Sequence, residues 1–226
     1  MEFKTTEIKE RVLADNNEAA ARTRERMRQS GTLLVNLMGS PGAGKTSVLL
    51  KLIERLGTQY RIGVMEADVD SDVDARTIAA TGTRVIQIHT GGLCHMDADM
   101  VSRALASFGV EDLDLIFLEN IGNLVCPAEF EIGADVRMMI LSVPEGDDKP
   151  LKYPLMFSVS DVMLVNKIDT APIFDFDFDA AVVRARSLNA QIVCVPVSAK
   201  SGRGFDEVVQ FLRMRLDERR QMHENN

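Results

Sequence analysis

The chain of 226 residues contains no tryptophan, two tyrosines and three cysteines. With aromatic residues at 5%, it offers little surface on which unpaired nucleic-acid bases could stack. It also lacks an excess of basic residues, since 34 Asp and Glu outnumber 26 Lys and Arg and leave a net charge of −8. Both features argue against a nucleic-acid partner, because binding a phosphate backbone requires a positively charged surface.

Long apolar runs are missing as well. No segment approaches the roughly 18–20 apolar residues that a membrane-spanning helix requires, and the first nine residues do not resemble a signal peptide. Three cysteines are too few, and odd in number, for a disulfide framework. We therefore expect a reduced, cytoplasmic protein without membrane contacts, in which any cysteine chemistry is local.

The chain instead alternates between short apolar runs and helical segments. This alternation predicts an α/β fold, with one mainly parallel sheet of about seven strands and helices on both faces. The predicted strands are 33–38, 61–66, 84–88, 113–118, 136–143, 162–166 and 191–196, and the predicted helices are 47–56, 72–81, 98–108, 179–188 and 204–219.

A further helix is predicted over residues 5–29, which contain neither Gly nor Pro and are rich in Glu, Arg and Ala. Its main apolar residues are Val12 and Leu13, so we expect it to be exposed or to face a partner. The predicted organisation is therefore an N-terminal helix over 1–30, followed by a single nucleotide-binding domain over 31–226.

Residues 39–46 match the phosphate-loop pattern G-x-x-x-x-G-K-[ST] in full, between a predicted strand and a predicted helix. The glycines let successive backbone amides point into one concavity, and the start of the helix adds positive potential. Lys45 can reach the β- and γ-phosphates, and the Thr46 hydroxyl can bind Mg²⁺. The predicted nucleotide-binding residues here are Gly39, Ser40, Pro41, Gly42, Ala43, Gly44, Lys45, Thr46 and Ser47.

A second motif predicts which base is bound. Asn166, Lys167 and Asp169 form an N-K-x-D motif at the end of a predicted strand. The Asp169 carboxylate can accept from N1–H and the 2-amino group of guanine, whereas adenine would present it with a lone pair. After the next strand, the tripeptide Ser198, Ala199 and Lys200 resembles the second guanine loop of GTPases. We therefore predict GTP and GDP as the nucleotides.

The motif expected to act on the γ-phosphate is unusual. Glu119 and Gly122 lie in the sequence E-N-I-G, where most GTPases have D-x-x-G. Glu119 can bind Mg²⁺, and the Gly122 amide can sense the γ-phosphate. Of the five acids within 66–74, we expect most to be solvated, but Asp68 to bind Mg²⁺ at the strand end. Lys45, Asp68, Glu119 and Gly122 are the catalytic candidates.

Neither Gln nor His adjoins Gly122 to orient an attacking water. We therefore expect slow intrinsic GTP hydrolysis, completed by dimerisation or by a partner.

Two cysteines and a histidine accompany these motifs. Cys94 and His95 are adjacent, and Cys126 lies in the motif that follows. Two thiolates and an imidazole suit Zn²⁺ or Ni²⁺, with a fourth position open to water, a second subunit or a carboxylate such as Asp97 or Asp99. The residues alone also allow another interpretation, in which both cysteines are small buried side chains and His95 starts a helix.

Taken together, these motifs resemble the HypB-type nickel-insertion GTPases of NiFe-hydrogenase maturation. The resemblance implies a GTPase of the dimer-forming class that includes signal-recognition and MinD-like proteins. It covers about 31–216 in order and spacing, and rests on the segments 39–46, 90–97, 119–127 and 166–169.

The resemblance further implies that Cys94, His95 and Cys126 bind nickel or zinc at or near a GTP-dependent homodimer interface. It implies other hydrogenase maturation factors as partners, with the hydrogenase large subunit as acceptor of the nickel. Residues 1–30 contain neither Cys nor His, so we do not expect the N-terminal nickel motif of many bacterial members. Asp99 and Arg103 stand where some relatives have histidines, so a second, histidine-rich site is not expected either.

Only six residues separate Glu119 from Cys126, and Gly122 lies between them. A γ-phosphate that moves Gly122 is therefore expected to move Cys126 as well. Two alternative functions stay open. One is a nickel-delivery GTPase of the urease-accessory type, although the pattern of that family is C-P-H and Cys94 here precedes His95 directly. The other is a non-enzymatic metal-binding module that GTP merely stabilises.

Overall fold

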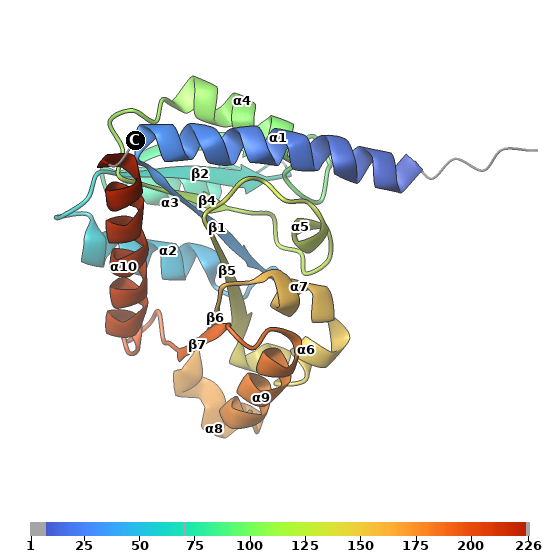
Figure 1. Cartoon of the computed structure of the whole chain (residues 1–226). Helices are drawn as coiled ribbons and strands as arrows, with labels where there is room; N and C mark the ends of the chain where they lie inside the picture. The colour runs from blue at the N-terminus through green and yellow to red at the C-terminus, as the bar shows by residue number, and fades with distance from the viewer. Residues whose placement is uncertain (1–7, 70, 225–226) are drawn as a thin grey trace, which may run out of the picture.

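A computed structural model of the chain describes residues 8–69 and 71–224. One seven-stranded sheet forms its centre, in the order β3-β2-β4-β1-β5-β6-β7, and all neighbouring strands are parallel (Figure 1). The predicted sheet is thereby confirmed. Its strands are β1 (Leu33–Gly39), β2 (Ile62–Asp68), β3 (Arg84–His89), β4 (Leu115–Glu119), β5 (Val136–Ser142), β6 (Val162–Asn166) and β7 (Val193–Pro196).

Helices cover both faces of this sheet (Figure 1). The five helices predicted beyond residue 31 are all present. Four short helices, α5 to α8, were not predicted, because none exceeds six residues and so none shows a helical repeat of apolar positions. The helices are α1 (Ile8–Ser30), α2 (Lys45–Leu56), α3 (Val73–Ala79), α4 (Ala98–Phe108), α5 (Cys126–Glu129), α6 (Lys149–Lys152), α7 (Pro154–Val159), α8 (Ala171–Phe174), α9 (Phe178–Leu188) and α10 (Phe205–Glu224).

The strands are apolar on both sides because the sheet is buried on both faces. On one face, Val35 and Leu37 of β1 pack in a cluster with Leu49 and Leu52 of α2 and with Leu212 of α10. On the other face, α1 and α4 cover the half of the sheet around β4, and α7 and α9 cover the half around β6. Burial of this kind contributes roughly 1.5–3 kcal/mol per large aliphatic side chain.

Helix α1 is more buried than its sequence predicts. It lies along α4 on the sheet's outer layer (Figure 1), and its side chains Asn16, Ala20, Thr23 and Met27 form a buried stripe at helical spacing. Val12, in contrast, is 48% exposed. The expectation of an exposed helix therefore holds for one face only, because small and polar residues make the buried face.

The carboxyl ends of all seven strands meet at one edge of the sheet, since all neighbouring strands are parallel. From the central strand β1 the chain continues to β2 on one side, while β5 lies on the other, which makes this edge a topological switch point where α/β folds bind ligands. Within residues 8–69 and 71–224, no helix is both long enough and apolar enough to span a bilayer.

Candidate functional site

The loop after β1 has the backbone that a phosphate cradle requires. Gly42 and Gly44 have φ of 76° and 94°, a left-handed conformation that favours glycine. A Cβ on Gly44 would also lie 2.5 Å from Nδ2 of Asn166. Because Gly44 is the N-cap of α2 and carries no side chain, the first amides of this helix stay available to an anion.

A cavity of about 680 Å³ lies between this loop, the end of β2 and the segment 119–122. All four catalytic candidates line it: Lys45, Asp68, Glu119 and Gly122. The Lys45 ammonium donates to the Ser40 carbonyl at 3.4 Å, and the Thr46 hydroxyl donates to Oε1 of Glu119 at 2.8 Å. These residues follow three different strands and lie up to 77 positions apart in the chain, yet they line one cavity.

The donor atoms of this cavity fit Mg²⁺. Glu119 is 3% exposed, and its Oε2 is buried without a hydrogen-bond partner among the described residues. Burial raises the pKa of Glu119 to about 7, although the Thr46 hydroxyl and the Lys45 charge oppose this shift. An unpaired carboxylate oxygen beside a hydroxyl is the kind of hard oxygen set that Mg²⁺ takes in nucleotide sites. Thr46, Glu119 and Asp68 are the residues that would hold the ion.

Glu66 is a residue that the sequence did not single out. The run of acids over 66–74 predicts a solvated side chain, but Glu66 is 3% exposed and lies beside Glu119 in the register of β2 and β4. Burial raises the pKa of Glu66 to about 7, and its Oε2 has no hydrogen-bond partner among the described residues. The sequence of β2 nevertheless indicates that Glu66 is buried. Alternate residues of a strand lie on one face, and Ile62 and Val64, which alternate with Glu66, lie on a buried face.

The guanine motifs meet in a second cavity of about 380 Å³. Asn166 links the loops, because its Nδ2 donates to the Ala43 carbonyl at 3.0 Å and its Oδ1 accepts from the Ala199 amide at 3.2 Å. The Lys167 ammonium donates to the Gly42 carbonyl at 2.7 Å. The cavity is lined by Gly44, Ser47, Asn166, Lys167, Asp169, Thr170, Ser198, Ala199 and Lys200.

Asp169 is exposed in this cavity, where it can meet a base. A hydrogen bond from the Ser198 side chain lowers the pKa of Asp169, so the carboxylate is charged at neutral pH. A charged acceptor at this point is what recognition of the N1–H and 2-amino donors of guanine requires.

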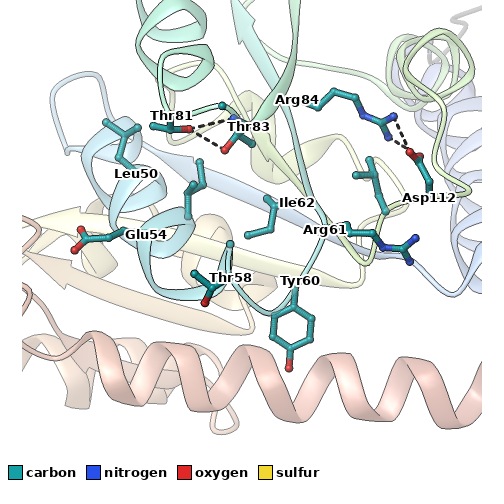
Figure 2. Close-up of a pocket in the computed structure, with 14 residues that line it drawn as sticks. Leu50, Glu54, Thr58, Tyr60, Arg61, Ile62, Thr81, Thr83, Arg84 and Asp112 are labelled. Carbon is teal, nitrogen blue, oxygen red and sulfur yellow. Dashed lines mark hydrogen bonds and ion pairs between the residues drawn. The ribbon is translucent and has the colours of Figure 1, made fainter.

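A larger cavity, of about 840 Å³, lies at the opposite edge of the sheet, near the amino ends of β2 and β3 (Figure 2). Its cationic side chains are already paired, Arg84 with Asp112 at 2.9 Å and Arg61 with Asp114 at 3.1 Å. The phosphate loop and the guanine motifs converge at the carboxyl edge instead. We therefore assign the nucleotide to the two smaller cavities, despite their size.

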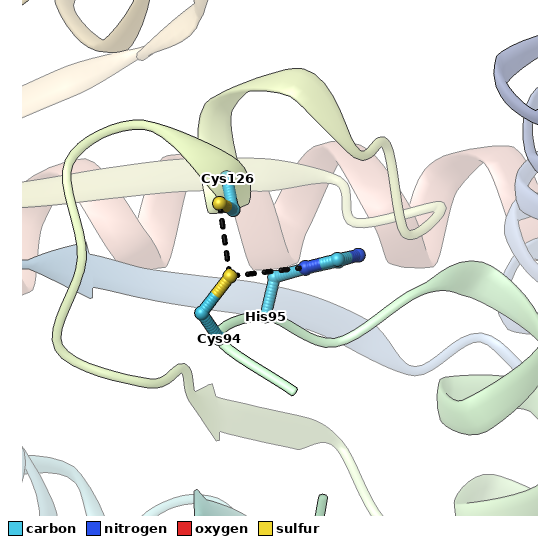
Figure 3. A group of neighbouring side chains, drawn as sticks. All are labelled: Cys94, His95 and Cys126. Carbon is cyan, nitrogen blue, oxygen red and sulfur yellow. Dashed lines mark hydrogen bonds between the residues drawn. The ribbon is translucent and has the colours of Figure 1, made fainter. Parts of the chain in front are cut away.

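The two cysteines and the histidine converge on one point (Figure 3). The ligand atoms of Cys94, His95 and Cys126 all lie within 4.8 Å of one another. The two Sγ atoms are 3.0 Å apart, and Cys94 Sγ is 3.8 Å from His95 Nδ1. Ligands around a tetrahedral zinc lie about 3.5–3.8 Å apart, so the Cys94–His95 distance already fits, and the two Sγ atoms would have to separate by less than about 1 Å to admit an ion.

The alternative interpretation of these three residues is wrong in two respects. Cys94 is exposed, so it is no core side chain. His95 lies before α4, whose N-cap is Asp97, with its carboxylate accepting from the Met100 amide at 2.7 Å. Among the described residues no carboxylate joins the cluster, which leaves a fourth position to water or to another molecule.

The surroundings of the cluster favour a neutral imidazole. The His95 ring stacks on Phe130, with centroids 3.9 Å apart, and burial lowers the pKa of His95. A hydrogen bond with Cys94 raises the pKa of the Cys126 thiol, so metal binding must release protons from the pair. Phe130 was not predicted from the sequence, because a single aromatic residue carries no pattern.

The segment 119–126 connects this cluster to the phosphate loop. The Asn123 amide donates to the Gly39 carbonyl at 3.1 Å, and a Cβ on Gly122 would lie 2.8 Å from Pro41. The Asn123 side chain donates to the Cys94 carbonyl at 3.3 Å. One short segment therefore contacts the loop that would hold phosphate and the loop that carries two candidate metal ligands.

Comparisons with known proteins agree with this geometry. Residues 33–195 match the family CobW/HypB/UreG, nucleotide-binding domain. Hydrogenase maturation factor HypB of Azotobacter vinelandii is 46% identical over 205 residues, which cover 91% of this chain and 68% of that protein.

Two solved structures of this family superpose closely. HypB from Archaeoglobus fulgidus is 38% identical, with a TM-score of 0.83 over 90% of this chain and 99% of that one. HypB from Helicobacter pylori in complex with nickel is 34% identical, with a TM-score of 0.85 over 90% and 96% of the two chains. This chain therefore belongs to the CobW/HypB/UreG family and, within it, to the HypB hydrogenase maturation factors.

Proposed function

We propose that this protein is a GTP-hydrolysing metallochaperone that binds nickel, or zinc in its place, and assists nickel insertion into NiFe hydrogenase. One observation carries the proposal: the segment 119–126 begins at the Mg²⁺ candidate Glu119 and ends at the metal candidate Cys126, with Asn123 bonded to both neighbouring loops. Other hydrogenase maturation factors and the hydrogenase large subunit are the proposed partners, in the reducing cytoplasm.

GTP is the proposed substrate because of the guanine cavity. The charged Asp169 would accept from two donors that adenine lacks, and the Ala199 region is held in place through Asn166. Leaving such a charged acceptor unpaired costs about 1–3 kcal/mol or more, which is sufficient to disfavour ATP.

Hydrolysis is proposed to be slow in the isolated protein. Lys45 would neutralise charge on the β- and γ-phosphates, and Gly122 would donate its amide to the γ-phosphate. When bound, Mg²⁺ would supply further charge compensation through Thr46, Glu119 and Asp68. Among the described residues lining the phosphate cavity there is neither Gln nor His to orient water, so a second subunit or a partner completes the site.

The nucleotide state would control the metal through Asn123. Contact between the γ-phosphate and Gly122 shifts the segment that contacts Pro41 and Gly39. The same shift alters the bond from Asn123 to the Cys94 carbonyl and moves Cys126. Linked sites of this kind typically differ in affinity by about 5–150-fold between states.

The test is a Ni²⁺ titration of the full chain bound to GDP or to a non-hydrolysable GTP analogue, together with phosphate release from GTP. We expect Ni²⁺ affinities that differ between the two states by about the 5–150-fold typical of coupled sites. Cys126→Ala should abolish the difference. Lys45→Ala should reduce phosphate release to background.

Cys194→Ala is the matched control, because Cys194 lies half-buried in β7, away from the cluster. It should behave as the wild type in both assays. Equal Ni²⁺ affinities in the two nucleotide states would contradict the switch, and phosphate release that Lys45→Ala leaves unchanged would support the non-enzymatic module instead.

A further inference from the structure

Asn16, on helix α1, bonds to both segments that carry the candidate metal ligands. Its Nδ2 donates to the Glu131 carbonyl at 2.7 Å, and its Oδ1 accepts from the Ala98 amide at 2.9 Å. The residue is 8% exposed, so both bonds are shielded from water. A single amide therefore joins two stretches of chain that are 33 residues apart.

Both stretches lie close to the metal cluster along the chain. Ala98 is the first residue of α4 and follows His95 by three residues. Glu131 follows Cys126 by five residues and adjoins Phe130, whose ring stacks on His95. Asn16 therefore sets the distance between the Ala98 amide and the Glu131 carbonyl. Because these groups lie within five residues of the candidate ligands, that distance affects how far apart the ligands lie.

The surrounding contacts hold α1 firmly enough for this role. Ala98 packs in a cluster with Ala19 and Ala20 of α1. Arg24 forms an ion pair with Glu131 at 3.2 Å. A Cβ on Gly133, where φ is 83°, would lie 2.5 Å from the Ala20 carbonyl, so this loop is pressed against the helix backbone. These contacts pack α1 directly against both loops.

Metal affinity depends strongly on such support. Ligand atoms must lie within a few tenths of an ångström of their bound positions, and residues that orient ligands from outside the coordination sphere typically change metal affinity by about 10–100-fold. Residues 90–97, which carry Cys94 and His95, form neither helix nor strand. Their position is therefore set by tertiary contacts.

We propose that Asn16 is a positioning residue of the metal site, which sets metal affinity by fixing the spacing between the Cys94–His95 loop and the Cys126 helix. The inference rests on the proposed binding of metal by Cys94, His95 and Cys126. Asn16 itself lies outside the cluster and acts through the Ala98 amide and the Glu131 carbonyl.

The test compares Asn16→Ala with the matched control Asn17→Ala, whose residue is exposed on the same helix. Ni²⁺ is titrated into the full chain bound to GDP, in competition with a coloured chelator, and the thiolate-to-nickel charge-transfer bands are recorded. We expect Asn16→Ala to weaken Ni²⁺ binding by about 10–100-fold and to change these bands. GDP affinity should stay unchanged, and Asn17→Ala should match the wild type throughout.

Asn16→Asp separates the two bonds and serves if the alanine variant does not fold. It can still accept from the Ala98 amide, but its second carboxylate oxygen faces the Glu131 carbonyl oxygen with no proton to donate, so the two oxygens repel and we expect Ni²⁺ affinity to fall at least as far as in Asn16→Ala. Wild-type affinity and bands in both variants would overturn the inference, even with a lower melting temperature, as would an equal loss of Ni²⁺ and GDP binding. A wild type that binds no Ni²⁺ would instead overturn the proposed function itself.

Discussion

Glu66 shows how burial changes the behaviour of a single carboxyl group. Its ordinary pKa of 4.5 is raised to about 7, chiefly because the folded protein removes water from it, and the charge of Glu119 adds to the shift. Between these two values the folded state binds more protons than the unfolded state. The free energy of unfolding therefore falls as the pH rises from about 4.5 to about 7.

Glu66→Gln removes this loss of stability. We expect the nucleotide-free variant to be more stable than the wild type at pH 8, by roughly 1–3 kcal/mol, with a much smaller gain at about pH 5. Urea unfolding at both pH values measures the difference in the free energy of unfolding between the variant and the wild type. Glu18→Gln, at an exposed position on α1, should show neither effect, and an equal gain at both pH values would contradict the role of the charge.

At the scale of elements, the phosphate loop and the guanine loops form one unit. Gly44 lies in the left-handed region, and a Cβ there would approach Asn166 Nδ2, which is bonded to the Ala43 carbonyl. Glycine is therefore required at position 44 for two reasons: the phosphate cradle needs its left-handed backbone, and the guanine loop leaves no room for a side chain.

Gly44→Ala should therefore damage both nucleotide cavities together. We expect GDP affinity, measured with a fluorescent derivative, to fall by at least about 10-fold, since the added methyl strains φ and displaces Asn166. Gly82→Ala is the matched control, because Gly82 has φ of 81° but a Cβ there meets no described atom within 4 Å. If both variants lowered GDP affinity equally, the close contact would not be the cause.

Helix length decides which helices can be predicted from the sequence. Helix α4 begins and ends where the sequence predicted, because its apolar residues recur at helical spacing; in the structure, Asp97 caps its start. Helix α5, which starts at Cys126, has only four residues and shows no repeat. Short helices depend on tertiary contacts, so their position could not be read from local patterns.

At the scale of the whole molecule, the candidate metal cluster lies on the surface beside exposed apolar side chains. Leu93 and Val125 are each 48% exposed and adjoin Cys94 and Cys126. Bound by Cys94, His95 and Cys126 alone, a tetrahedral metal ion would keep a fourth position open. These features fit the GTP-dependent homodimer interface that the family resemblance implies at or near the metal site.

Leu93→Asp is expected to weaken that dimer. The assay is light scattering with a GTP analogue, Mg²⁺ and Ni²⁺, in which the wild type should double in mass. The variant should remain monomeric at protein concentrations about 10-fold higher, because a charge in an apolar interface costs over about 1.4 kcal/mol. Leu151→Asp, at a 64% exposed position on α6, should dimerise normally. A wild type that stays monomeric under these conditions would contradict the dimer.

The sequence by itself determined the sheet of alternating strands and the nucleotide motifs. Residues 39–46 and Asn166 to Asp169 are local patterns whose chemistry follows from residue types at fixed spacing. The same sequence carries the family resemblance, which implies Cys94, His95 and Cys126 as metal ligands.

Only the tertiary structure decided which distant residues meet. It places Cys126 Sγ 3.0 Å from Cys94 Sγ, sets Glu66 beside Glu119, and brings Asn16 to both segments that carry the candidate metal ligands. The physical reason is that neighbouring parallel strands are joined by crossover connections, so residues far apart in the chain share one sheet edge. No local pattern records those contacts.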